Sequence, residues 1–343
     1  MDKLKIASIK GSIKRSSKSL AKWFAPDSFS QYDDLLDPSI QEVDIFIQTN
    51  LIKWKFYIRN RNKQYEYILK SKKPKLVSES PVFRSITLKD PKMQLQRLGW
   101  NSYQYGDSDY NNENSSSDRW NWLQKEYSIS RKDWKKKGDY ILLLLQKPGD
   151  SSLNKLYIEN GYNIFNYGAW VSDTVRDIRK YTDRKIIIRP HINQQSNGLK
   201  NAERVASEFS NVEVSSNYEW LPEFGASGGT GLQKDLANAW CAVTYNSLSS
   251  IEGILSGTPV VALDRGCMAW PVAEQKLSNI ENISRDHDIS QWLYDLAYTC
   301  WTTEELISGK TWEHLKPRYE YWKNKTQNSD TREIELWKKY FKK

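Results

Sequence analysis

The chain has 343 residues, enough for two domains at about 150 residues each. With 51 Lys and Arg against 42 Asp and Glu, it carries a net charge of +9, and its 13% aromatic content argues against disorder. The longest apolar run, residues 141–145, is too short to span a bilayer, and no apolar stretch typical of a signal peptide follows the basic start. We therefore expect neither a membrane-spanning protein nor a secreted scaffold.

Cysteine and histidine are few and scattered. The three Cys and three His show no spacing typical of a metal site. We expect reduced thiols, a cytoplasmic setting and no bound metal.

The positive charge is confined to the first part of the chain. Residues 1–138 hold 27 Lys and Arg against 16 Asp and Glu, a net of +11, whereas residues 139–343 hold 24 against 26, a net of −2. Such asymmetry indicates a polyanionic partner for the first half, although a basic face exposed only to solvent is the alternative.

The first half alternates strand and helix patterns. A β-branched run at 43–48 predicts a strand, the basic stretch 51–70 predicts an amphipathic helix, and 75–78 predicts a second strand. This order predicts a parallel βαβ unit. The polar, aromatic stretch 99–120 is typical of a long functional loop.

The second half predicts a doubly wound parallel sheet. Strands are expected at 139–145, 185–189, 211–214, 241–245 and 259–263, and helices at 169–181, 200–209, 232–238 and 249–256. Further helices are expected at 289–298, 303–308 and 334–341. The predicted domains are residues 1–138, residues 139–325, and a C-terminal helix in 326–343 that returns to the first domain.

Polar residues follow three of the predicted strands. Because parallel strands end at one edge of a sheet, these residues should converge there. Ser249 and Ser250 lie where a helix starts, a position suited to a helix cap and to binding phosphate, although a capped helix is common in any α/β domain. Arg189 suits a diphosphate, or alternatively an ion pair with a nearby acid. The expected donor-binding residues are Gln146, Lys147, Gly149, Asp150, Ser151, Arg189, His191, Asn246, Ser247, Ser249, Ser250 and Glu252.

These motifs resemble the donor-binding half of two-domain GT-B glycosyltransferases. The likeness lies in a strand followed by NSLSS, a helix with Glu and Gly, and GTPVV, together with the strand end RPH. More narrowly, RLGWNSYQYGDSDYNNENSSSDRW, TDRKIIIRPH, AVTYNSLSSIEGILSGTPVVALDRGCMAWPVAEQ and QWLYDLAYTCWTTEELISGKTW resemble one family of bacteriophage glycosyltransferases. That likeness covers most of residues 75–315.

The resemblance implies an α/β fold of GT-B architecture, with two Rossmann-like domains facing a central cleft. It implies a metal-independent hexosyltransferase that needs no cofactor and takes a nucleotide-sugar, UDP-sugar first, in the second domain. The DxD triplet at 107–109 lies outside that domain, which speaks against a metal role. If the enzyme inverts the sugar, a carboxylate must deprotonate the acceptor, and Asp107, Asp109 and Glu79 are the candidates.

The basic first half would hold the acceptor. Neutral glycans need no such charge, whereas a polyanion gains affinity through counterion release. Phages glycosylate hydroxymethylated pyrimidines, so the first expectation is double-stranded DNA as acceptor, a monomer, and the cytoplasm of the host cell. Its expected DNA-binding residues are Lys53, Lys55, Arg59, Arg61, Trp100, Tyr103 and Tyr105. The alternatives are a transferase of surface polysaccharide or lipopolysaccharide synthesis and a non-catalytic nucleic-acid-binding protein of the same fold.

Overall fold

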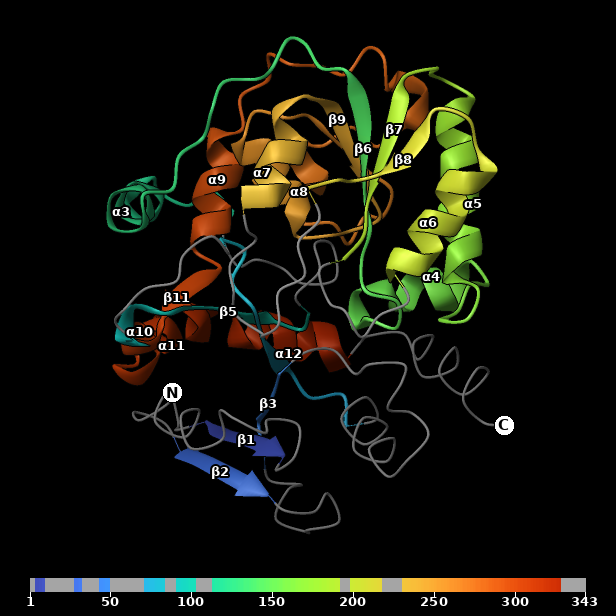
Figure 1. Cartoon of the computed structure of the whole chain (residues 1–343). Helices are drawn as coiled ribbons and strands as arrows, with labels where there is room; N and C mark the ends of the chain where they lie inside the picture. The colour runs from blue at the N-terminus through green and yellow to red at the C-terminus, as the bar shows by residue number, and fades with distance from the viewer. Residues whose placement is uncertain are drawn as a thin grey trace.

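Two β-sheets organise the described part of the chain, each in its own half of the molecule (Figure 1). They are seen in a computed structural model that describes residues 4–9, 28–32, 43–49, 71–83, 91–102, 113–191, 198–217 and 230–327. Among these residues, no helix has both the length and the apolar character needed to cross a membrane. The predicted helices 51–70 and 334–341 lie outside the described residues.

The first sheet has the strand order β11-β5-β4-β3-β1-β2. Its strands are β1 (Lys5–Ile9), β2 (Ser28–Tyr32), β3 (Ile45–Thr49), β4 (Lys75–Glu79), β5 (Leu95–Trp100) and β11 (Cys300–Thr302). Strands β3 and β4 pair in parallel, which confirms the expected parallel relation of these two strands. The pairs β4–β5 and β5–β11 are antiparallel, so this side of the sheet departs from a purely parallel arrangement.

The chain returns to the first sheet much earlier than expected. Strand β11 pairs with β5, with Trp301 opposite Gln96. The helices that follow are α10 (Thr303–Ile307), α11 (Lys310–Leu315) and α12 (Tyr319–Gln327). Side chains from α11 and α12 pack with those of β1, β3, β4 and β5 in one core. The segment from Cys300 to Gln327 thus packs with the first sheet, although the sequence groups it with the second half, because a three-residue strand carries too little pattern to predict its partner.

The second sheet is parallel throughout, with the order β10-β9-β6-β7-β8. Its strands are β6 (Tyr140–Leu144), β7 (Lys185–Arg189), β8 (Val212–Val214), β9 (Ala239–Thr244) and β10 (Val260–Ala262). The central strand β6 is buried on both faces: Ile141 and Leu143 enter one core, and Leu142 and Leu144 enter the other. Burial on both faces explains the unbroken apolar sequence of β6. The five predicted strands are confirmed, since each overlaps an observed strand of this sheet.

Helices cover both faces of the second sheet (Figure 1). Helices α5 (Tyr167–Arg179) and α6 (Gly198–Glu208) pack on one face, with the short α4 (Asn154–Glu159) below them. Helices α7 (Thr230–Ala237), α8 (Ser249–Leu255) and α9 (Ser290–Ala297) pack on the other. All but α4 lie close to predicted helices.

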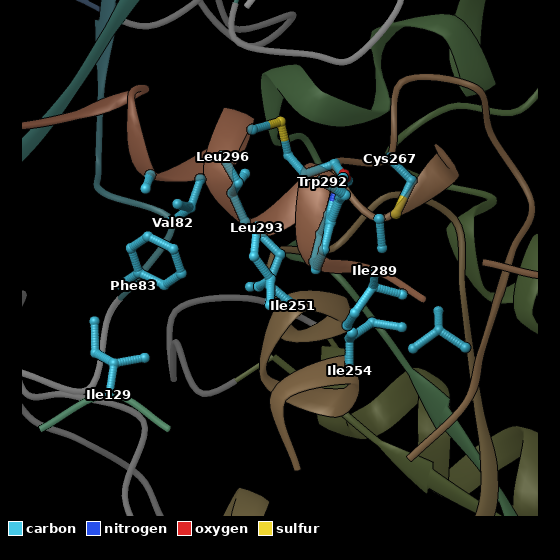
Figure 2. Close-up of a cluster of buried hydrophobic side chains, with 14 of the residues drawn as sticks. Val82, Phe83, Ile129, Ile251, Ile254, Cys267, Ile289, Trp292, Leu293 and Leu296 are labelled. Atoms are coloured by element: carbon cyan, nitrogen blue, oxygen red, sulfur yellow. The ribbon is translucent and has the colours of Figure 1, made fainter. Parts of the chain in front are cut away.

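A continuous hydrophobic core joins the two halves. Figure 2 shows Val82 and Phe83, which follow β4, beside Leu293 and Leu296 of α9. Helix α3 (Asp118–Tyr127) contributes to the same core and packs on α9. Side chains of the first half therefore pack directly on a helix that follows the second sheet.

Candidate functional site

The carboxyl edge of the second sheet gathers polar side chains from several strands. Gln146 follows β6, Arg189 ends β7, Asn246 follows β9 and Asp264 follows β10. In Figure 1, β6 descends toward α4, so this edge faces the half that holds the first sheet. Ligands of open α/β sheets bind at this edge, which makes it the candidate site.

Gln146 and Asn246 form the centre of the site. The Gln146 amide nitrogen donates to Asn246 Oδ1 at 2.5 Å and to Ser152 Oγ at 2.6 Å. In return, the Asn246 backbone N–H donates to Gln146 Oε1 at 3.2 Å. Both side chains are buried, so these bonds fix the relative positions of the loops after β6 and β9.

Asp264 extends this network to a third strand. The Asn246 amide nitrogen donates to Asp264 Oδ2 at 2.7 Å and to the Ser152 carbonyl at 2.8 Å. The Asp264 carboxylate is 9% exposed, so it is part of the interior and bonded there. Asp264 was not among the predicted site residues, although its position directly after the predicted strand 259–263 was a usable signal.

Two buried phenols hold the loop after β6. Tyr167 accepts a hydrogen bond from the Gln146 N–H at 3.2 Å, and Tyr157 accepts one from the Gly149 N–H at 2.8 Å. Burial raises the pKa of both phenols, so they stay protonated. Gly149 itself has φ +77°, a conformation that glycine adopts without strain.

The turn of this loop involves the predicted residue Asp150. Its Oδ1 accepts a hydrogen bond from the Ser152 N–H at 3.0 Å, and its side chain is half-buried. Lys147 is half-buried in the same loop. The side chain of Ser151 lies outside the described part of the structure. The donor-binding roles of these residues stay predictions.

Arg189 is engaged in a buried ion pair. Its guanidinium contacts Asp235 of α7, and the two side chains are 7% and 2% exposed. The Asp235 carboxylate also accepts hydrogen bonds from Ser215 Oγ at 2.6 Å and from the Asn217 amide at 2.8 Å. The structure thus shows Arg189 in an ion pair with a nearby acid, which was the alternative to its predicted contact with a diphosphate. His191, half-buried two residues later, keeps its phosphate role as a prediction.

The start of α8 corrects the expected serine cap. The helix begins at Ser249 after the N-cap residue Leu248, whose side chain makes no capping hydrogen bond. Ser250 is fully buried, and its hydroxyl donates to the Ser247 carbonyl at 2.7 Å. The Ser247 hydroxyl accepts from the Ser249 N–H at 3.3 Å. Ser250 is therefore part of the packed interior and not a donor toward a ligand, whereas Glu252, one turn on, is half-buried.

The residues expected in the first half are only partly described. Glu79 ends β4, is half-buried, and accepts a hydrogen bond from the Ser80 N–H at 2.8 Å. Trp100 corrects an expectation: it is fully buried, donates to the Leu315 carbonyl at 3.0 Å, and packs on Trp312 and Tyr319. An interior ring cannot stack on a base. The other candidates lie outside the described residues: Lys53, Lys55, Arg59, Arg61, Tyr103, Tyr105, Asp107 and Asp109.

Within the described ranges, no group of three or more His, Cys, Asp or Glu side chains is arranged to hold a metal ion. The metal independence implied by the resemblance stays an expectation.

Comparison with known proteins identifies the fold. No family model matches the sequence, and no curated protein matches it. Among solved structures, the Thermosulfurimonas dismutans KpsC, beta Kdo 2,4 transferase, aligns with a TM-score of 0.53 at 14% identity, over 87% of this chain and 91% of that one. The beta Kdo 2,7 transferase of the same organism's KpsC aligns with a TM-score of 0.47 at 13% identity, over 90% and 98%.

The first of these likenesses shows a shared fold at low identity. It agrees with the two α/β halves and with the parallel second sheet. The expected α/β fold of GT-B architecture, with two Rossmann-like domains, is therefore confirmed. In such an architecture the network of Gln146, Asn246 and Asp264 lies at the strand ends of the second domain, facing the first.

Proposed function

We propose that this chain is a glycosyltransferase that takes its sugar from a nucleotide-sugar, with a UDP-sugar as the first candidate. The observation that carries the proposal is the buried network of Gln146, Asn246 and Asp264. It fixes three strand ends at the edge where open α/β sheets bind ligands, and preorganised sites of this kind lower the cost of binding. The shared fold with a Kdo transferase supports the same activity.

The reaction needs charge neutralisation on the donor and a base on the acceptor. In the proposed transfer, the acceptor hydroxyl oxygen bonds to the anomeric carbon while the bond from that carbon to the donor phosphate breaks. The Lys147 ammonium would stabilise the leaving diphosphate, and Glu252 would bind ribose. In an inverting reaction, a carboxylate of the first domain, Glu79, Asp107 or Asp109, takes the proton.

For the acceptor we favour an acidic glycan. The solved neighbour with the shared fold is named a Kdo transferase, so its name gives an acidic sugar as the group that it transfers, and a glycan is the kind of product such transfers build. The net charge of +11 on residues 1–138 fits an acceptor that carries negative charge. This corresponds to the surface-polysaccharide alternative of the sequence analysis.

Double-stranded DNA with hydroxymethylated pyrimidines is the second candidate acceptor. The charge of the first half favours it equally, because phosphates also bind a basic surface. Its predicted contacts Lys53, Lys55, Arg59 and Arg61 provide the means to separate the two candidates. Replacing these four residues by Ser should flatten the salt dependence of DNA binding if DNA is the acceptor.

The test offers the purified protein a panel of donors and acceptors. UDP-glucose, UDP-N-acetylglucosamine, GDP-mannose and CMP-Kdo are each combined with Kdo-terminated oligosaccharide, hyaluronan oligosaccharides, hydroxymethylated DNA and unmodified DNA. We expect mass spectrometry to find one acidic glycan heavier by one sugar, with release of the matching nucleotide. Transfer to hydroxymethylated DNA alone would select the second candidate, and no binding of any nucleotide in calorimetry would refute a transferase.

A further inference from the structure

Arg265 is an exposed arginine in a segment that is otherwise packed into the interior. It directly follows Asp264 of the candidate site, and both Asp264 and Gly266 on either side of it are buried. In the run 260–269, Arg265 is the one exposed residue. Charged side chains are usually exposed, so exposure alone carries little weight. The backbone, the location and the charge of Arg265 add three further observations.

Hydrogen bonds fix the turn that carries Arg265. The Cys267 N–H donates to the Asp264 carbonyl at 3.0 Å, which closes a β-turn with Arg265 at its second position. The Asp264 N–H donates to the carbonyl of Tyr245, just after β9, at 3.1 Å. The backbone of Arg265 is therefore in place before a ligand arrives, and only its side-chain torsions remain to be ordered on binding.

The turn lies against two predicted donor-binding residues. On one side of Arg265, the Asp264 carboxylate accepts a hydrogen bond from the Asn246 amide at 2.7 Å. On the other side, the Cys267 thiol donates to Ser250 Oγ at 3.4 Å. Asn246 and Ser250 bound the loop between β9 and α8, so these contacts place Arg265 beside that loop, at the carboxyl edge of the second sheet.

The charge of Arg265 is available to a ligand. Within the described residues, its side chain makes no ion pair or hydrogen bond, whereas Arg189 at the same edge is engaged by the buried Asp235. A guanidinium presents a planar fork of N–H donors that matches the oxygens of a phosphate. A nucleobase and a ribose are uncharged, so the charge of Arg265 selects the phosphate part of a nucleotide.

From these observations we propose that Arg265 binds the phosphate of the nucleotide-sugar donor, the contact that was expected of Arg189. This inference rests on the proposed function and adds a residue to its donor site. The turn belongs to the sheet proposed to hold the donor, and the residues on either side of Arg265 bond to Asn246 and Ser250. This position therefore favours the phosphate of the donor over a negative charge on the acceptor.

The experiment measures nucleotide binding by calorimetry. UDP, GDP and CMP are titrated into wild type, and the tightest of the three into Arg265→Ala. We expect its Kd to rise about 10- to 100-fold, as for the loss of hydrogen bonds to a charged group. Arg265→Lys keeps the charge without the fork and should give an intermediate Kd. Equal Kd values for wild type and Arg265→Ala would overturn the inference and leave the proposed function intact.

Two further measurements identify the phosphate as the group that Arg265 contacts. Saturation-transfer NMR should find the matching nucleoside bound equally by wild type and Arg265→Ala, because it has no phosphate. Added salt should weaken nucleotide binding to wild type more than to Arg265→Ala, since salt screens the lost attraction. A nucleoside that loses as much affinity as the nucleotide, or equal salt dependence in both proteins, would overturn the inference.

Arg176→Ala is the matched control. The Arg176 side chain is 57% exposed and lies in the last turn of α5, the helix that leads into the start of β7. Its ion pair with Asp173 is exposed and contributes little to stability. This variant removes the same kind of side chain at the opposite edge of the second sheet, so it should leave the nucleotide Kd unchanged.

Acceptor kinetics separate the donor phosphate from an acidic acceptor. With whichever acidic oligosaccharide of the panel accepts sugar, Arg265→Ala should keep the acceptor KM of wild type at saturating donor. A raised acceptor KM with an unchanged nucleotide Kd would assign Arg265 to the acceptor and overturn the inference. If wild type binds no nucleotide, the proposed function and the inference fail together. Nucleotide binding that Arg265→Ala weakens supports the inference even if no transfer is observed.

Discussion

Arg119 and Glu305 form a buried, two-pronged ion pair between α3 and α10. Arg119 Nη1 lies 2.9 Å from Glu305 Oε1, and Nη2 lies 2.8 Å from Oε2, with the side chains 6% and 13% exposed. The same guanidinium donates to the carbonyls of Ala297 and Cys300 and lies over the Trp301 ring, 4.2 Å from its centre. One side chain thus fixes the segment through which the chain returns to the first sheet.

Glu305→Ala should destabilise the protein by about 3–5 kcal/mol, because it leaves the Arg119 charge buried without its partner. Urea unfolding followed by tryptophan fluorescence measures the loss. Glu304→Ala, one position earlier on the same helix, is the control and should cost less than about 1 kcal/mol. Equal losses in the two variants would show that the ion pair contributes nothing particular.

Stability should fall in two steps as the pH is lowered. Burial and the Arg119 charge lower the pKa of His314 to about 4 in the folded protein. The unfolded chain therefore takes up a proton on this residue below about pH 6.5, and the fold loses stability from there down to about pH 4. His314→Phe keeps a ring against Tyr298 and should remove this upper step.

The lower step belongs to Glu305. Although burial opposes ionisation, the hydrogen bonds and charge of Arg119 outweigh it and lower the pKa of Glu305 to about 2. The stabilising effect is complete above about pH 4.5 and is lost as the pH falls toward 2. Unfolding free energies measured by urea titration at pH 7, 5, 4 and 3 resolve both steps, and a flat profile in wild type would contradict both.

Arg189→Ala separates the ion pair from a role in donor binding. If the only role of Arg189 is its ion pair, the variant leaves Asp235 buried without its counter-charge and loses about 3–5 kcal/mol of stability. Arg189→Met combined with Asp235→Asn should recover most of that loss and bind UDP normally in calorimetry. A stable Arg189→Ala that no longer binds UDP would instead support the diphosphate contact.

Asn246→Ala should impair transfer more than stability. The variant frees the Gln146 amide and the Asp264 carboxylate, so the loops after β6, β9 and β10 lose their common partner. We expect kcat/KM to fall by about 100-fold, since small misplacements of a site have effects of this size. Ser256→Ala removes a buried hydroxyl at the other end of α8 and should keep wild-type kcat/KM, because its hydroxyl bonds only within that region.

Trp100→Ala should lower stability by about 3–5 kcal/mol, as expected for a large side chain removed from a core. Trp100→Phe keeps most of the packing and loses the hydrogen bond to the Leu315 carbonyl, so it should cost less. Thermal unfolding measures both. If the Phe variant bound DNA more weakly without losing stability, Trp100 would have a role at the surface after all.

The second sheet was predictable because its central strand β6 is buried on both faces. The runs 140–145 and 186–188 are apolar throughout, and polar residues directly follow them. The first sheet was harder, because β1, β2 and β5 mix polar and apolar residues over five or six positions. Strand β11 is three residues long and depends on a partner more than 200 residues earlier in the chain, which no local pattern reveals.

At the site, the sequence indicated the correct edge but not the partner of each side chain. Gln146 and Asn246 were expected there, and they lie there, yet bonded to each other. Arg189 carries a charge that had two possible partners, and only the fold brings Asp235 to it. Ser250 and Trp100 have the residue types and positions of ligand-binding residues in the sequence. The fold instead buries both side chains in the interior.

The pairing of β5 with β11 has a consequence for synthesis of the protein. Leu95 and Thr302 are neighbours in the sheet, so the first sheet cannot gain its edge strand until residue 302 has left the ribosome, about 200 residues after β5. At about 5–20 residues per second, this delay is roughly 10–40 seconds, during which the second sheet has everything it needs to form. The first half is therefore synthesised first but completed last. Until β11 is made, one edge of β5 stays unpaired, and unpaired strand edges favour aggregation unless another chain or a chaperone covers them.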